Sequence, residues 1–96
     1  MKEYTRVIDE LGRIVIPAEL RQRLGLDAAR LLLKPIDRTI VLQRTEDDPE
    51  AGCFVCKVDD LGRIVLPGEL MQKQGWKEKD HITMYNTDNL VILKFA

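Results

Sequence analysis

One pattern of apolar and polar positions occurs twice along this chain. Residues 9–20 read DELGRIVIPAEL and residues 59–70 read DDLGRIVLPGEL, with identical residues at nine of the twelve positions. A segment that recurs in this way indicates one structural unit used more than once. The chain therefore divides into a first repeat, residues 1–44, and a second repeat, residues 53–96, joined by the acidic segment 45–52.

Each repeat is predicted to form two strands, a short helix and a hairpin. Alternating or β-branched runs predict the strands, and a glycine closes the tight turn between the first two. A proline then ends the second strand, and a glycine ends the helix of about two turns. The predicted strands are 4–9, 13–16, 29–34, 39–44, 54–59, 63–66, 81–85 and 90–95, the helices are 18–24 and 68–74, and the hairpin turns are 35–38 and 86–89. The fold class is mostly β, with the order β-β-α-β-β twice.

The size of one repeat predicts how the two are arranged. A unit of about 44 residues lies near the limit below which a chain cannot bury a sufficient core alone. The linker can span about 26–29 Å, and it holds the second repeat at an effective concentration of about 1 mM. We therefore expect an intramolecular pseudo-dimer with both Gly-Arg turns on one face. The alternative is that repeats of different chains pair with each other.

Composition narrows the class of protein. The apolar fraction of 45% and the charged fraction of 32% are typical of a compact soluble domain. No apolar run approaches the length of about 18 residues that a membrane span needs. The start of the chain, MKEYTRVIDE, is too charged for the apolar core of a signal peptide. A cytoplasmic protein without a membrane partner is expected.

Charge is unevenly distributed between the repeats. The net charge of −1 argues against a general polyanion binder, yet residues 1–44 carry nine basic and six acidic residues. Seven of those nine basic residues are arginines, which bind phosphate or guanine through two hydrogen bonds better than lysine does. The second repeat carries six residues of each sign, so the first repeat is the stronger candidate for binding nucleic acid.

The ordered motif IDELGRIVIPAELR, followed by Leu-Gly and a terminal hairpin, resembles the AbrB/MazE/SpoVT family of bacterial transition-state regulators and antitoxins. The match extends over nearly the whole chain, twice, as in MraZ-type members that fuse two units. The resemblance implies a swapped-hairpin β-barrel and double-stranded DNA as the partner. It also implies a contact made by arginines on one face.

The family's DNA-contacting positions carry over most completely to the first repeat. In the second repeat Cys56, Met71 and Gln72 replace three of the four positions. The candidate DNA-binding residues are Arg6, Arg13, Arg21, Arg23 and Arg63, with Lys57 and Lys73 nearby. The asymmetry leads to the hypothesis that the first repeat reads DNA, so that Arg13→Ala weakens promoter binding more than Arg63→Ala.

Each candidate also has a purely structural interpretation. Arg13 and Arg63 could form salt bridges with the aspartates four positions earlier, and an orienting carboxylate is compatible with DNA contact. Arg21 and Arg23 could solvate the first helix, while Lys57 and Lys73 are typical surface lysines. Trp76 occupies the position of Leu26 and is predicted to lie in the core.

No motif predicts catalysis, a cofactor or a bound metal. Cys53 and Cys56 form a lone CxxC, and a structural zinc site would need two further ligands at matching spacing. The cysteines are expected to be reduced and packed. The leading function is a DNA-binding transcription regulator. Further association of pseudo-dimers is left open, because the arginines of one half could serve a palindrome only if two chains meet. The alternatives are an antitoxin, for which a toxin-wrapping tail is missing here, and a scaffold module that binds no DNA.

Overall fold

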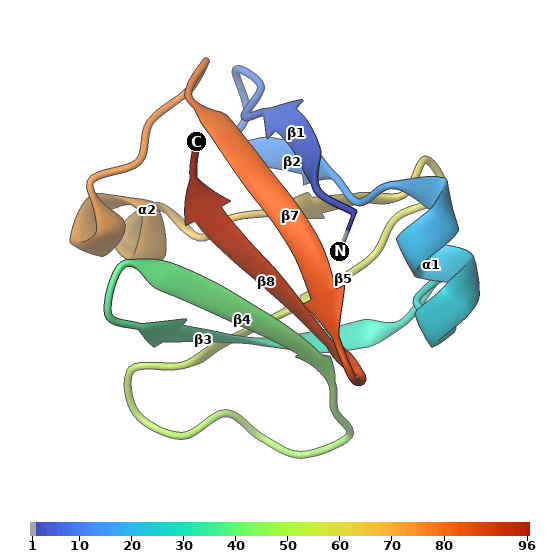
Figure 1. Ribbon diagram of the computed structural model, residues 1–96. Helices are drawn as coiled ribbons and strands as arrows, with labels where there is room; N and C mark the ends of the chain where they lie inside the picture. Colours follow the sequence, from blue (N-terminus) through green and yellow to red (C-terminus); the bar gives the residue numbers. More distant parts are fainter. Residues whose placement is uncertain (1) are drawn as a thin grey trace.

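Two antiparallel sheets form the framework of the protein in the computed structural model, which describes residues 2–96 (Figure 1). The larger sheet has the strand order β1-β7-β8-β4-β3-β5, and the smaller one consists of β2 and β6. The strands are β1 Tyr4–Val7, β2 Arg13–Val15, β3 Arg30–Ile36, β4 Thr39–Arg44, β5 Phe54–Lys57, β6 Arg63–Val65, β7 His81–Thr87 and β8 Leu90–Phe95, and the helices are α1 Ala18–Leu24 and α2 Gly68–Gln74.

The strands pair across the two repeats. The first strand of each repeat joins the hairpin of the other, since β1 pairs with β7 and β5 pairs with β3. The two hairpins meet through β4 and β8, and the short strands β2 and β6 pair with each other. Ile14 lies opposite Ile64 in this ladder, so the pairing has the two-fold pseudosymmetry expected of a pseudo-dimer. All of these pairings are made within one chain.

The larger sheet is open, so the closed barrel that the resemblance implies is not formed. Strands β1 and β5 are its two edges, and in the part of the chain that the structure describes each pairs with one neighbour only. The chain leaves each edge strand through a tight turn and enters β2 or β6, which have three residues each. These two strands are too short to bridge the edges and form a separate ladder instead. The prediction of a mostly β fold with two short helices is confirmed.

The hairpins are longer than the sequence pattern predicts. Strand β3 continues through Pro35 to Ile36, and only Asp37 and Arg38 remain for the turn. Proline is tolerated there because β5 pairs with β3 only as far as Leu33, so this end of β3 has a single neighbour. Strand β7 extends to Thr87 in the same way.

The core lies between the sheets and the helices, and both repeats supply it. Leu20 of α1 and Leu70 of α2 are fully buried, as are Ile14 and Ile64 under the small ladder. Trp76 is also buried, as its correspondence with Leu26 predicts. No helix in residues 2–96 is both long enough and apolar enough to cross a membrane.

Candidate functional site

The small ladder of β2 and β6 presents one face to solvent. Strand residues alternate between faces, and the central Ile14 and Ile64 point into the core. The residues on either side of them therefore point outward. We call this surface the ladder face, and it consists of Arg13, Val15, Arg63 and Val65. Both predicted Gly-Arg turns thus supply their arginines to one face.

An aspartate holds each of these two arginines in place. In the first repeat Asp9 Oδ1 accepts hydrogen bonds from the backbone N–H groups of Leu11 (2.9 Å) and Arg13 (2.8 Å). Its Oδ2 accepts a third from Arg13 Nε at 2.7 Å. In the second repeat Asp59 makes the same bonds with Leu61 and Arg63, at 2.9, 2.8 and 2.7 Å. The predicted salt bridges are therefore present in both turns.

These contacts favour the ionised carboxylates. For Asp59, the backbone N–H of Arg63 lowers the pKa most, burial opposes this, and the Arg63 guanidinium and the Leu61 N–H lower it further. For Asp9, burial raises the pKa, but the hydrogen bonds from Arg13 and Leu11 outweigh it and leave the pKa lowered. The aspartates therefore stay negatively charged at neutral pH.

The orienting contact leaves most of each guanidinium uncommitted. Arg13 and Arg63 use Nε for the aspartate, and their side chains are each 28% exposed. Among residues 2–96, no group accepts a hydrogen bond from the two terminal nitrogens of either arginine. Those nitrogens are the ones that can donate in parallel to a phosphate or to a guanine edge. The structural and the binding interpretations are thus compatible.

Two other candidates lie on the strands that precede these turns. Lys57, at the end of β5, lines a hollow of about 380 Å³ together with Asp59, Asp60 and Arg63. Arg6 lies in β1, where its guanidinium stacks over the Tyr4 ring at 5.9 Å. The Arg6 Nη1 atom donates to the carbonyl of Thr5 at 2.9 Å, so most of this guanidinium is also available to a ligand.

Arg21 is turned inward and does not belong to the ladder face. Its side chain is only 18% exposed, its Nε donates to Asp27 at 2.8 Å, and its Nη1 donates to the carbonyl of Ile16. The guanidinium also lies against Gly62, where any added Cβ would overlap it. Gly62 has a φ of +78°, so the turn of the second repeat requires glycine for its backbone conformation, and a side chain there would also displace the Arg21 guanidinium. Arg21 of the first repeat therefore packs against the turn that carries Arg63.

The remaining candidates lie on the last turns of the two helices, which are at opposite ends of the molecule (Figure 1). Arg23 donates to Asn86 Oδ1 at 3.0 Å and to Glu19 at 3.2 Å, so it joins α1 to the hairpin of the second repeat. Lys73 occupies the equivalent position on α2. The structure does not bring these two residues together with the ladder face.

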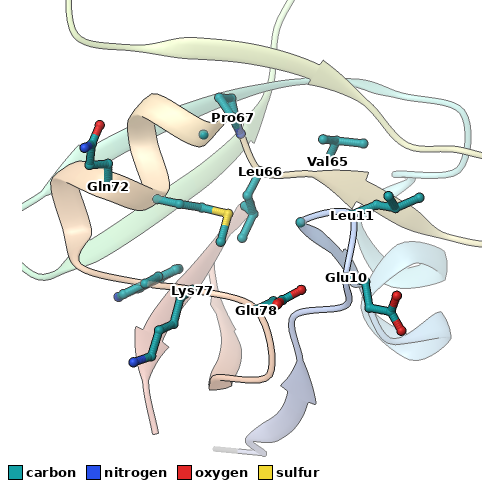
Figure 2. Close-up of a pocket in the computed structure, with 12 residues that line it drawn as sticks. Glu10, Leu11, Val65, Leu66, Pro67, Gln72, Lys77 and Glu78 are labelled. Carbon is teal, nitrogen blue, oxygen red and sulfur yellow. The ribbon is translucent and has the colours of Figure 1, made fainter.

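A pocket beside α2 was missed by the sequence reasoning. Figure 2 shows it between the helix, the first turn and the segment that follows Trp76, and its volume is about 680 Å³. Apolar walls come from Leu11, Leu66 and Met71, with Glu10 and Glu78 near the mouth. The available signal was the difference between the repeats, since Met71 stands where the first repeat has Arg21.

The cysteines have no partner among the described residues. Cys53 and Cys56 are both free and half-buried, and burial raises the pKa of the Cys56 thiol to about 12. A thiol with such a pKa is protonated and unreactive at neutral pH. Across residues 2–96, no group of three or more His, Cys, Asp or Glu side chains is arranged to hold a metal ion.

Comparison with known proteins yields a similar fold. No family model and no curated protein matches the sequence. Among solved structures, the chain is similar to the solution structure of PHS018 from Pyrococcus horikoshii, with a TM-score of 0.58 and 20% sequence identity. The alignment covers 97% of this chain and 89% of that one. At this level of identity the similarity shows the fold alone.

Proposed function

We propose that this protein is a double-stranded DNA-binding transcription regulator that contacts DNA through the ladder face. The observation that carries the proposal is the pair of arginines, Arg13 and Arg63, each aimed by its own aspartate and each with two unused donor nitrogens. Further contacts are assigned to Lys57, which lines a hollow together with Arg63, and to Arg6, on the strand that precedes the first turn. The resemblance to bacterial transition-state regulators gives this arrangement its functional interpretation.

The geometry suits duplex DNA for a specific reason. The two arginines are related by the pseudo-two-fold axis of the β2–β6 ladder, and a duplex with a palindromic site has a two-fold axis of its own. A guanidinium held in one orientation can donate to O6 and N7 of guanine at once, and each such contact gives about 1–3 kcal/mol of base discrimination. The aspartates reduce the net charge of the face, so binding should depend more on base contacts than on counterion release.

The contact set is narrower than the sequence alone suggests. Arg21 is left out because its guanidinium donates to Ile16 and Asp27 and packs against the turn at Gly62. Arg23 is engaged with Glu19 and Asn86 and is left out of the set. Lys73 is left out because it lies in the last turn of α2, at the position equivalent to that of Arg23.

Selection of genomic fragments by the purified protein, followed by footprinting, tests the proposal. A protected duplex site of two-fold symmetry is expected. Arg13→Ala and Arg63→Ala should each weaken binding to that site by about 10-fold or more, which is the loss of one good base contact. Arg38→Ala is the matched control, because Arg38 lies exposed in the turn between β3 and β4 and should bind like the parent. Failure to select any DNA at low salt would refute the proposal.

The same variants test the division of labour between the repeats. A larger loss for Arg13→Ala than for Arg63→Ala is the expectation from the charge asymmetry of the sequence. The two side chains have equal exposure and equal contacts to aspartate, and Lys57 lies beside Arg63. Equal losses would therefore mean that both repeats contact DNA. The replacement of arginines elsewhere in the second repeat would then leave the ladder face unaffected.

A further inference from the structure

The two repeats differ in how they fill the space between the helix and the opposite turn. In the first repeat this space is occupied by the chain's own Arg21, whose guanidinium donates to the Ile16 carbonyl and to the Asp27 carboxylate. In the second repeat the same helix position is Met71, which cannot donate a hydrogen bond. The pocket of about 680 Å³ lies at this place in the second repeat.

The second repeat nevertheless retains both acceptors. Ile16 and Leu66 are equivalent, because their N–H groups donate to the carbonyls of Gly62 and Gly12, each at 2.8 Å. The second repeat has one more residue than the first between the glycine that ends the helix and the next strand. Counted back from that strand, Glu78 is the counterpart of Asp27, because each directly precedes a residue with a positive φ, Lys79 (72°) and Ala28 (57°). The second repeat therefore keeps a carbonyl and a carboxylate at the positions that bind a guanidinium in the first.

The charge and the walls of the pocket match the same ligand chemistry. Glu10 and Glu78 line its mouth, and among residues 2–96 neither carboxylate takes part in an ion pair or a side-chain hydrogen bond. In Figure 2 the Glu78 carboxylate lies between Lys77 and Glu10, whereas the Lys77 side chain points away from the centre of the pocket. Leu11 and Met71 supply apolar surface beside these acceptors.

We propose that this pocket binds a small alkylguanidinium compound, an arginine-like molecule whose guanidinium takes the place that Arg21 fills in the first repeat. The guanidinium donates to Glu78 and to the Leu66 carbonyl, and the alkyl chain lies along Met71 and Trp76. A planar guanidinium can donate to two separate acceptors at once, as Arg21 does. The volume lies in the range of about 300–1,000 Å³ that is usual for small-molecule sites.

Met71 provides the necessary adaptability. Its sulfur lies against the first turn, 3.5 Å from the place that a Cβ on Gly12 would take. An unbranched methionine side chain changes its conformation at low cost. Met71 can therefore pack against the alkyl chain of the ligand rather than exclude it. The proposal rests on the comparison of the repeats and is independent of DNA binding.

Titration of the full chain with N-butylguanidinium, followed by amide NMR shifts, tests the proposal. Saturable shifts are expected around Gly12, Leu66 and Glu78. The neutral isostere N-butylurea should bind at least about 10-fold more weakly, because it loses the charge-assisted hydrogen bonds. Equal binding of the two compounds, or no shift at millimolar concentration, would overturn the proposal.

Three variants locate the site. Met71→Arg should place a guanidinium in the pocket from within, as in the first repeat, and abolish the shifts, whereas Met71→Leu should retain them. Glu78→Gln should weaken binding by about 10-fold with the amide spectrum otherwise unchanged, and it carries the test if Met71→Arg does not fold. Binding that persists in both Met71→Arg and Glu78→Gln would overturn the proposal. A capped Gly-Arg-Gly peptide that binds more tightly than N-butylguanidinium would also overturn it, since the site would then serve a polypeptide arginine.

Discussion

At the scale of single residues, the two Gly-Arg turns depend on ionised aspartates. Asp9 and Asp59 each accept two backbone hydrogen bonds and one from an arginine, and these contacts lower the pKa of both carboxyls against the opposing effect of burial. Glu19, at the surface, also has a lowered pKa. Hydrogen bonds from Tyr4 and then Lys2 lower its pKa and tie the start of the chain to α1.

The sign of these shifts predicts the pH dependence of stability. A carboxyl whose pKa is lowered by folding contributes stability above its unfolded pKa of about 4 and loses it as the pH falls through the folded value. The free energy of unfolding, measured with urea, should therefore be constant from about pH 7 to 5 and fall below about pH 4. The double variant Asp9→Asn/Asp59→Asn should show a smaller fall. An equal fall in the variant would show that other groups cause the acid sensitivity.

At the scale of elements, each helix is joined to the hairpin of the other half of the sheet. Gln74, the last residue of α2, donates from Nε2 to the carbonyls of Thr39 (2.9 Å) and Asp37 (3.3 Å) in the first hairpin. Arg23 of α1 reaches Asn86 in the second hairpin. Short helices of about two turns have little stability of their own, so such contacts and the burial of Leu20 and Leu70 hold them in place.

Removal of one such contact should be measurable. Gln74→Ala should lower the free energy of unfolding by about 1 kcal/mol, because two backbone carbonyls of the first hairpin lose their donor. Gln22→Ala is the control, since Gln22 is exposed on α1 and its side chain makes no hydrogen bond among the described residues. Its effect should lie within about 0.5 kcal/mol of zero. Equal effects of the two substitutions would indicate that the bond to the hairpin contributes nothing in solution.

The sequence predicted the elements better than their limits and connections. The position of both helices was correct, because a proline before each and a glycine after each act locally. The extension of β3 through Pro35 could not be predicted, because it depends on where a strand from the other repeat stops. Likewise, the inward turn of Arg21 depends on Gly62, which lies 41 residues away in the chain and packs against it only in the fold. The pocket beside Met71 depends on the equivalent contact in the other half of the molecule, where Met71 meets the first turn at Gly12.

At the scale of the whole molecule, the two repeats share their structure so completely that neither forms a sheet by itself. Within residues 2–96, β1 has its only partner strand in the second repeat and β5 has its only partner strand in the first. Both sheets contain strands from both repeats, and the fully buried Ile14 and Ile64 meet between them. Folding of one repeat alone would leave an unpaired edge and an uncovered core, which is why the sequence needs two copies.

This arrangement predicts that the folded state does not depend on protein concentration. If the repeats pair within one chain, urea unfolding followed by the fluorescence of the buried Trp76 should give the same midpoint at about 50 nM and at about 50 µM. If folding instead required repeats of two chains to pair, a thousandfold dilution would cost about 4 kcal/mol of apparent stability and lower the midpoint clearly. Sedimentation at the lower concentration supplies the second measurement and should find a folded monomer. Loss of folded structure in step with dissociation would contradict the intramolecular pseudo-dimer. Association of intact pseudo-dimers at the higher concentration would be compatible with it, because that step adds contacts without being required for either sheet.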